Sequence, residues 1–341
     1  MKKVALWVSE PYSGDELFNE NSPLNRDNCL VPAQLLKNEL GKMGWECHTQ
    51  DIYKANKITP TIVLFTDIPW LPIDVLLDNW KSRVKKWVIL QECEVIMPHN
   101  WEVNRHTQFD KIFMWNDEFV DGKRYFKMNV PNMFPESVSG DIFKKCNLCT
   151  LIAMNKKAKH PLELYSKRLE VIRWFEKYHP NEFDLYGIGW DEYTFEGIRP
   201  VRALNKLRLF RKLFAGHFPS YKGRIERKKP VLEKYKFAIC FENAKDIPGY
   251  ITEKIFDCFF AGCVPIYWGA NNVTDHIPKN CFIDKRGFDS YEKLYEFIKG
   301  MDDTTYQKYI NNAQEYLNSP MSYEFTAECF AKTIINGLVN E

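Results

Sequence analysis

Residues 235–269, which read YKFAICFENAKDIPGYITEKIFDCFFAGCVPIYWG, determine the fold class predicted for this chain. The aromatic and apolar run at 235–240 predicts a buried strand, and a Pro-Gly pair interrupts the polar loop that follows it. Thr252 suits the N-cap of a helix, Gly262 suits its C-terminal stop, and 263–268 predict a second strand. This order is typical of a parallel βαβ unit, in which ligands bind beyond the carboxyl ends of the strands.

The first turn of the predicted helix carries Glu253 and Lys254, and the loop before it carries Glu242 and Asn243. Backbone N–H groups at a helix N-terminus favour an anion, whereas a lysine there opposes the helix dipole. We therefore expect a negative charge close to Lys254. A phosphorylated ligand is the simplest source of that charge.

Predicted strands and helices alternate along both halves of the chain, which indicates an α/β fold with parallel sheets. The strands predicted in the first half are at 3–8, 46–51, 61–67, 86–91 and 111–115, and the helices are at 31–43 and 73–84. The second half adds strands at 150–153 and 183–186, and helices at 163–177, 291–299, 306–317 and 324–339. The stretch 135–147, which contains Ser-Gly-Asp, predicts a linker between the halves.

A length of 341 residues and a hydrophobic fraction of 45% predict about two domains with packed cores. The ten cysteines are scattered through predicted strands and helices, as is typical of free thiols in a reducing compartment. The apolar run at the N-terminus is too short for a signal peptide, and no segment approaches the apolar length of a membrane span. Together these features favour an enzyme of the cytoplasm.

The segment 85–98, KKWVILQECEVIMP, places Glu92 and Glu94 directly after a buried strand. Carboxylates at i and i+2 of an extended chain point to the same side, here at the carboxyl end of a parallel strand. A carboxylate pair in a partly desolvated cleft raises one pKa, which yields a general base near neutral pH. The alternative interpretation is a pair of solvated acids on a loop.

Residues 199–229 carry eleven basic residues against a single acid, Glu226, for a local net charge of +10. Leucine and phenylalanine recur at helical spacing through the middle of the segment, which predicts a basic amphipathic helix. Such a helix is typical of contact with a membrane surface or with an anionic glycan; the alternative is a solvated helix packed on its own domain. The overall charge of only +2 disfavours nucleic-acid binding.

Sequence features also bear on metals and dinucleotides. The chain contains no Asp-x-Asp triplet, and its seven histidines form no pair at metal-ligand spacing. Cys146 and Cys149 form a C-x-x-C without a second pair at zinc-finger spacing. Gly187 and Gly189 lack the third glycine of a dinucleotide fingerprint, which disfavours a dehydrogenase. If the chain catalyses the departure of an anionic leaving group, we therefore expect cationic side chains, and no divalent metal, to stabilise the negative charge of that group.

Several short motifs, in order, resemble the C-terminal motif of the α-1,3/1,4-fucosyltransferases. They are FEN at 241–243, YITEK at 250–254, AGCVPIYWG at 261–269 and IPKNCFID at 277–284. An ordered set of motifs is far more specific than one glycine pattern. The alternative is a generic nucleotide-binding βαβ unit with an accidental TEK.

The resemblance implies an α/β fold of GT-B type, in which two Rossmann-like domains face a cleft. On that architecture residues 1–145 form an N-terminal domain that binds the acceptor, and residues 146–320 form a C-terminal domain that binds a GDP-sugar. Residues 321–341 form a C-terminal helix that packs back towards the N-terminal domain.

The resemblance also implies an inverting glycosyltransferase that transfers L-fucose from GDP-fucose to an N-acetylglucosamine- or glucose-containing glycan, in α-1,3 or α-1,4 linkage. Glu92 matches the general base, and Glu94 stays in reserve because three apolar residues precede Pro98 where the family has Ser-Pro. Glu253 matches a second catalytic residue, which lies against the donor sugar. The donor-binding residues implied by the match are Arg168, Lys222, Glu242, Asn243, Tyr250, Thr252 and Lys254, with no metal or other cofactor required.

Fucosyltransferases of the eukaryotic secretory route carry a membrane anchor. This chain resembles instead the bacterial kind, which works in the cytoplasm or at the inner face of the membrane on surface polysaccharide or lipopolysaccharide precursors. Two alternatives stay open. One is a transferase of the same fold that uses another nucleotide sugar, and the other is a non-catalytic relative that binds glycans.

Overall fold

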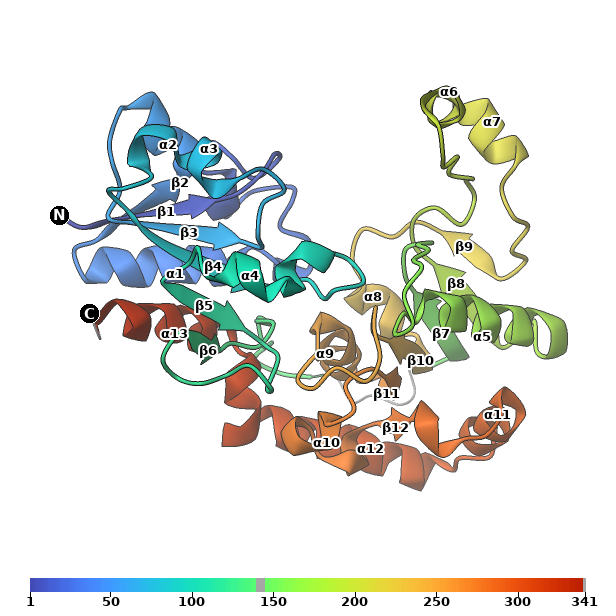
Figure 1. Cartoon of the computed structure of the whole chain (residues 1–341). Coiled ribbons are helices and arrows are strands. Elements are labelled where there is room, and N and C mark those ends of the chain that lie inside the picture. Colours follow the sequence, from blue (N-terminus) through green and yellow to red (C-terminus); the bar gives the residue numbers. More distant parts are fainter. Residues whose placement is uncertain (139–144, 340–341) are drawn as a thin grey trace.

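The computed structural model describes residues 1–138 and 145–339, and each half of the chain forms one β-sheet (Figure 1). Both sheets have six strands, and the pairings between neighbouring named strands are parallel. The predicted α/β class with two Rossmann-like halves is therefore confirmed. The predicted linker at 135–147 includes residues 139–144, which lie outside the described residues.

The first sheet has the strand order β2-β1-β3-β4-β5-β6. Its strands are β1 Lys3–Trp7, β2 Glu46–Thr49, β3 Ile62–Thr66, β4 Lys85–Leu90, β5 Lys111–Met114 and β6 Tyr125–Lys127. The α-helices of this half are α1 Val31–Lys42, α2 Gln50–Ala55, α3 Ile73–Leu77 and α4 Val103–His106. Ile62 pairs with Val4 on one side and with Lys85 on the other, so the central strands end at a common edge.

The second sheet has the strand order β12-β11-β10-β7-β8-β9. Its strands are β7 Asn147–Ile152, β8 Phe183–Tyr186, β9 Tyr221–Gly223, β10 Tyr235–Phe241, β11 Val264–Trp268 and β12 Ile283–Asp284. The α-helices of this half are α5 Tyr165–Tyr178, α6 Arg199–Ala203, α7 Arg208–Leu213, α8 Lys229–Leu232, α9 Glu253–Phe260, α10 Val273–His276, α11 Tyr291–Lys299, α12 Asp303–Leu317 and α13 Ala327–Val339. The stretch 235–269 thus forms the predicted βαβ unit, as β10, α9 and β11.

Both faces of each sheet are covered, because alternate residues of one strand enter different cores. In β1, Val4 and Leu6 pack with α1 and α13, whereas Ala5 packs on the opposite face with α2 and α3. In β10, Ala238 and Ile239 divide between two cores in the same way. This double burial explains why the strands read as nearly continuous apolar runs.

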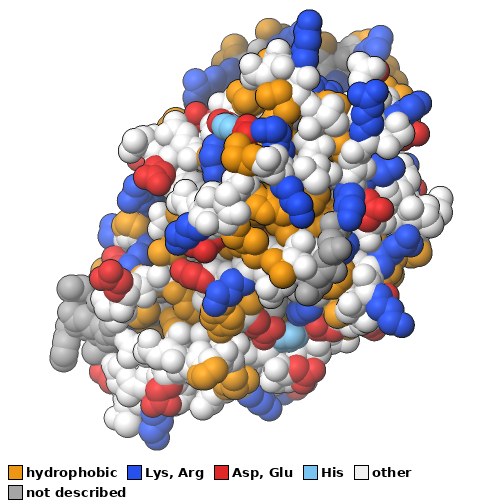
Figure 2. Space-filling view, turned by 90° about the vertical axis from the view of Figure 1, so that its left-hand side faces the viewer, with side chains coloured by type: hydrophobic (Ala, Val, Ile, Leu, Met, Phe, Trp, Pro, Cys, Tyr) orange, Lys and Arg blue, Asp and Glu red, His pale blue; other side chains and the backbone are white. Residues whose placement is uncertain are grey.

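The last helix, α13, packs against the first sheet, although it follows the second sheet in the chain (Figure 1). Phe330, Ile334 and Leu338 join the core that α1 covers. A Cβ added at Gly337 would lie 3.2 Å from the ring of Phe113, so the helix approaches the sheet closely. Figure 2 shows the side on which both chain ends lie, where hydrophobic side chains gather across the middle between scattered basic ones.

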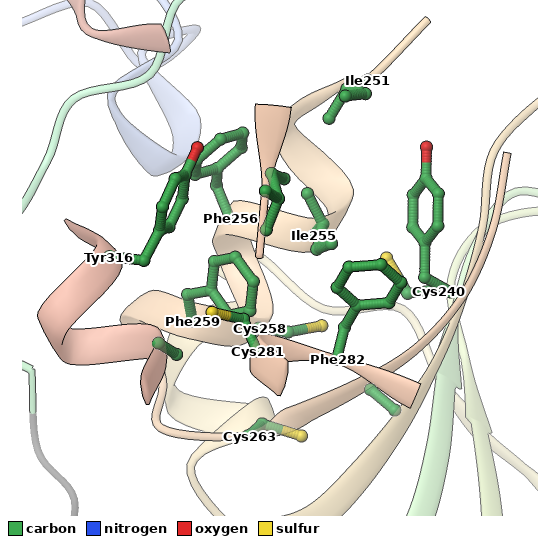
Figure 3. Packing of buried hydrophobic residues seen from close by; sticks show 14 of the residues in the cluster. Cys240, Ile251, Ile255, Phe256, Cys258, Phe259, Cys263, Cys281, Phe282 and Tyr316 are labelled. Carbon is green, nitrogen blue, oxygen red and sulfur yellow. The ribbon is translucent and has the colours of Figure 1, made fainter. Parts of the chain in front are cut away.

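Aromatic rings and thiols fill the core between α9, α12 and β10 (Figure 3). Phe259 of α9 lies 6.0 Å from Phe256 and 6.2 Å from Tyr316, measured between ring centroids. Four thiols belong to the same core, those of Cys240, Cys258, Cys263 and Cys281, and all ten cysteines of the chain are free. This packing holds α9 firmly against the sheet, with its N-terminus at the carboxyl end of β10.

Two elements of the first half are shorter than the sequence predicts. The strand predicted at 46–51 ends at Thr49, whose backbone N–H donates to the side chain of Asp15 (2.8 Å). The helix predicted at 73–84 ends at Leu77, because Asp78 has a positive φ of 48° with ψ of −115°, which is not a helical conformation. A residue with positive φ cannot continue a right-handed helix, and Asp is among the residues that adopt positive φ most readily.

The basic segment 199–229 does not form one amphipathic helix. It contains α6, a 3-10 turn at Leu204–Lys206 and α7, and these short helices stand away from the body of the molecule (Figure 1). The break falls at Leu207, whose backbone is extended with φ of −97° and ψ of 94°. Within the described residues, none of the helices has both the length and the apolar character that crossing a membrane requires.

A polar cluster joins the two sheets through His276 of α10. Its Nε2 lies 3.0 Å from Asp117, which follows β5, and its Nδ1 lies 3.0 Å from Glu324, which precedes α13. Asp117 also accepts hydrogen bonds from Lys127 and Asn272. Burial lowers the pKa of His276, but the hydrogen bonds to the two carboxylates outweigh it and raise the pKa to about 9.

We predict that replacing His276 with Gln removes a pH-dependent part of the stability. A histidine pKa raised on folding stabilises the protein fully below its unfolded value, and this contribution is lost as the pH rises through the folded value. The shift from 6.5 to about 9 corresponds to roughly 3 kcal/mol. Urea unfolding at pH 6, 7.5 and 9.5 should therefore show a parent that loses stability across this range relative to H276Q.

The matched control is H217Q, because His217 is an exposed histidine of the second half. Its unfolding free energy should follow that of the parent at each pH. Equal pH dependence of the parent and H276Q would contradict the assignment.

Candidate functional site

A cleft lies between the two sheets, at the carboxyl ends of their strands. Its cavity has a volume of about 620 Å³. The first half lines it with the end of β4, including Glu92, and with the loop at 128–133. The second half lines it with the end of β10, with Arg168 of α5, and with Glu253 and Lys254 of α9. The two places singled out in the sequence therefore share one crevice.

A buried carboxylate, Glu242, organises the N-terminus of α9. Glu242 is 0% exposed, and its two oxygens accept hydrogen bonds from the backbone N–H (2.8 Å) and the hydroxyl (2.7 Å) of Thr252. Thr252 occupies the predicted N-cap position, but its hydroxyl makes no capping bond because it is directed to Glu242. The structure thus assigns Glu242 and Thr252 to anchoring the helix, with Thr252 also on the cavity wall.

The same carboxylate supplies the negative charge expected beside Lys254. Lys254 Nζ lies 3.0 Å from Glu242 Oε2 and also donates to Thr252 Oγ1 (2.9 Å). Burial lowers the pKa of Lys254, but Glu242 and Glu253 outweigh this effect and raise it. The expectation of a nearby charge is therefore met by the chain itself, and Lys254 gives no independent argument for a phosphorylated ligand.

Arg168, Asn243 and Tyr250 form a second group on the cavity wall. Arg168 is buried on α5, and its guanidinium donates to the carbonyl of Phe241 (2.7 Å) and to Asn243 Oδ1 (3.0 Å). Asn243 Nδ2 in turn donates to the hydroxyl of Tyr250 (3.2 Å). The ring of Tyr250 lies 4.6 Å from that of Trp115, which belongs to the first half. A planar, fixed guanidinium of this kind suits recognition of two oxygens of an anion.

Glu253 belongs to a charged cluster that crosses the cleft. Lys228 Nζ lies 2.7 Å from Asp257 and 3.4 Å from Glu253, while the Lys228 backbone N–H donates to Asp27 of the first half (3.2 Å). Burial acts to raise the pKa of Glu253, but Lys254 and Lys228 hold it well below its usual range. Glu253 is therefore an ionised carboxylate at the cavity wall.

Glu92 lies opposite this cluster, directly after β4. Its side chain is half-buried on the cavity wall. Burial raises the pKa of Glu92, and the charge of Asp67 adds to the rise. A cleft carboxylate with a raised pKa meets the chemical requirement for a general base near neutral pH.

Glu94 does not share this position. The chain turns directly after Glu92, since the N–H groups of Ile96 and Met97 both donate to the carbonyl of Cys93. Glu94 lies off the cavity wall, and its carboxylate is 3.4 Å from His160. The expectation that Glu92 and Glu94 point to the same side is therefore wrong, because it assumed an extended chain. The carboxylate that faces Glu92 from its own half is Asp67.

Among the residues that the structure describes, those that line the cavity do not include Lys222. It lies on β9, the outermost strand of the second sheet, and its ammonium is 3.2 Å from Asp184. The cavity wall does include Lys228, which the family resemblance also singles out, and it includes Lys156 and Asp257, which were not among the predicted site residues. The spacing of Asp257 four residues after Glu253 was a signal for it, because both then share one helix face.

Sequence comparison with a family of known proteins matches the second half of the chain. Residues 201–333 match the family model of the C-terminal part of glycosyltransferase family 10 (fucosyltransferase). The α-(1,3)-fucosyltransferase FucT of Helicobacter pylori is 36% identical over 75 residues, which are 22% of this chain and 16% of that protein. The α-(1,4)-fucosyltransferase of Arabidopsis thaliana is 39% identical over 80 residues, 23% of this chain and 20% of that protein. The chain thus matches a fifth or less of the length of these two relatives.

Solved structures resemble the chain over nearly its whole length. A crystal structure of an α1,3-fucosyltransferase with GDP-fucose gives a TM-score of 0.52 at 14% identity, over 98% of this chain and 89% of the other. An α-glucosyltransferase in complex with UDP-glucose and DNA gives 0.59 at 12% identity, over 99% of both chains. At these identities the likeness shows the fold alone, the two-domain GT-B architecture. The family model and the ordered motifs together show that residues 201–333 are similar to the C-terminal part of glycosyltransferase family 10, the fucosyltransferase family.

Proposed function

We propose that this chain is an inverting glycosyltransferase that transfers L-fucose from GDP-fucose to a glycan containing N-acetylglucosamine or glucose. The observation that carries the proposal is the single cleft, in which Glu92 lies opposite Arg168, Glu253 and Lys254. A base and an anion site on facing walls are what displacement of a nucleotide leaving group requires.

The donor would bind to the second half. Arg168 and Lys254 hold the diphosphate. Their positive charges stabilise the leaving group more strongly as it gains negative charge in the transition state. Asn243 and Tyr250 position the nucleotide sugar. Glu253, held ionised by two lysines, lies against the sugar and stabilises the positive charge that develops at its ring. No divalent metal is required on this proposal.

The acceptor would bind to the first half, at residues 1–145. Its hydroxyl oxygen attacks the anomeric carbon of fucose while Glu92 removes the hydroxyl proton. The new C–O bond forms as the bond between the anomeric carbon and the phosphate oxygen breaks, and the electron pair leaves with GDP. Because GDP-fucose is β-linked, a single displacement gives an α-linked product, in α-1,3 or α-1,4 linkage.

Replacing Glu92 with Gln tests the base. The amide keeps the size of the side chain but cannot accept the proton, so turnover should fall by about 100-fold or more. GDP affinity, measured by calorimetry, should stay at the parent value because the anion site is on the opposite wall. E94Q is the matched control, and it should keep the parent turnover since Glu94 lies off the cavity wall. Full turnover by E92Q would remove Glu92 from the mechanism.

The donor is tested by measuring GDP or UDP release from GDP-fucose, GDP-mannose and UDP-glucose, each with a panel of glycan acceptors. We expect release from GDP-fucose, unchanged by EDTA because Arg168 and Lys254 supply the positive charge. Turnover with UDP-glucose alone would reject the donor in favour of another nucleotide sugar. Donor binding without turnover on any glycan would favour the non-catalytic alternative.

We also infer that residues 198–214 contact an anionic membrane surface, as expected for an enzyme of surface polysaccharide or lipopolysaccharide synthesis at the inner face of a bacterial membrane. Six cations and no acid occur in this arm: Arg199, Arg202, Lys206, Arg208, Arg211 and Lys212. Leu209 and Leu213 of α7 are 78% and 74% exposed. Exposed leucines beside clustered cations fit a bilayer that carries anionic headgroups.

An ion pair and several hydrogen bonds fix the conformation of the arm. Arg211 Nη2 lies 2.7 Å from Glu192 Oε2, and the backbone carbonyl of Arg211 accepts a hydrogen bond from the N–H of Tyr193 (2.7 Å). Asn205 both donates to and accepts from the backbone of Phe195. The arm therefore presents its leucines on a folded hairpin.

Vesicle co-sedimentation tests the arm, with phosphatidylcholine vesicles that either contain or lack phosphatidylglycerol. The parent should bind only the anionic vesicles, less at high salt, and the double variant L209S/L213S should bind about tenfold less. The control L71S/V75S removes two exposed apolar side chains elsewhere and should bind like the parent. Equal binding to neutral vesicles, or no loss in L209S/L213S, would contradict the proposal.

A further inference from the structure

The dipeptide Gln91–Glu92 lies outside regular secondary structure, yet side chains bond all four of its backbone polar groups. Asp67 Oδ1 accepts from both N–H groups, at 2.7 Å for Gln91 and 3.1 Å for Glu92. The Gln91 carbonyl accepts from the indole of Trp115 (3.0 Å), and the Glu92 carbonyl accepts from the indole of Trp101 (3.1 Å). A dipeptide held at every backbone polar group has little freedom to move its backbone, so the point from which the Glu92 side chain extends is fixed.

Asp67 is itself held in an unusual conformation. It follows β3 with φ of 60°, in the left-handed region that non-glycine residues adopt rarely. Its backbone N–H donates to Ile89 of β4 (2.8 Å), and its carboxylate also accepts from Asn100 Nδ2 (2.7 Å). Asn100 is fully buried and accepts from the backbone of Ile68 (2.8 Å). The carboxylate is therefore fixed from several sides at the end of the strand next to β4.

We propose that Asp67 is a positioning residue for Glu92, which fixes the backbone of the base and places a negative charge beside its carboxyl. This inference rests on the proposed transferase function. The carboxylate has two separable effects, because its oxygen accepts the two backbone N–H groups while its charge disfavours ionisation of Glu92.

Several charged groups act on the carboxyl of Glu92, and among them Asp67 has the largest effect on the pKa of Glu92. Lys254 and Glu253 act from α9 and Lys156 from the loop after β7, with the two lysines opposing the two acids. Burial is the largest cause of the raised pKa of Glu92, and Asp67 comes next. The neighbouring groups that also sense the charge of Glu92 are Cys93, Tyr165 and Tyr250.

Two substitutions separate charge from position. D67N keeps an oxygen acceptor but removes the charge, so the acidic limb of the pH profile of kcat/KM should move to lower pH by about half a unit or more. D67E keeps the charge but displaces the carboxylate by a methylene, so kcat should fall about tenfold with the limb near its parent position. GDP affinity should match the parent in both variants and shows that each is folded.

Amide hydrogen exchange in residues 91–97 provides a readout independent of activity. D67E should lose protection there, whereas the control D74N, an exposed aspartate of α3, should not. An unmoved acidic limb in D67N together with parent-like exchange in D67E would overturn the proposal. If the parent itself transfers no sugar, the proposed function fails, and the exchange measurement still decides whether Asp67 positions the loop.

Discussion

The buried carboxylate of Glu242 is the constraint on which the cleft depends. It directly follows β10, accepts hydrogen bonds from both the backbone and the side chain of Thr252 at the N-cap of α9, and forms an ion pair with Lys254. A Cβ at Gly269, the residue after β11, would lie 2.3 Å from the hydroxyl of Tyr267 and 2.5 Å from Glu242, so this position must be a glycine. Glu242 therefore joins β10 to the start of α9 through its carboxylate and to β11 through its backbone N–H, which donates to Trp268 (2.8 Å). Removing it would leave the half-buried Lys254 without the nearer of its two carboxylate partners, since Glu253 lies 3.8 Å away.

In each half of the molecule, a carboxylate at the end of a strand fixes the backbone of a segment that carries site residues. In the second half a buried acid at a strand end holds the start of α9; in the first half Asp67, after β3, holds the loop that carries Glu92. Both devices use a charge-assisted hydrogen bond to backbone N–H groups, which is stronger than a bond between neutral groups. The hydrogen bonds of His276 and the packing of α13 on the first sheet then hold the two halves together.

The sequence predicted the βαβ unit and the position of Glu92 because both are local patterns of apolar runs and chain breaks. It did not predict that Glu94 turns away, since a turn after Cys93 depends on hydrogen bonds that no periodicity records. Lys222 was misplaced for a topological reason, because its strand lies at the outer edge of the sheet. Asp67 was missed because it is 25 residues from Glu92 in the chain and meets it only across neighbouring strands.

A crystal structure with GDP bound decides whether one cleft brings a donor site and a proton acceptor together. We expect the diphosphate to contact Arg168 and Lys254, with its outer phosphate directed towards Glu92. A nucleotide bound instead in the smaller cavity beside Trp174 and Trp268, on the outside of the second half, would contradict this expectation.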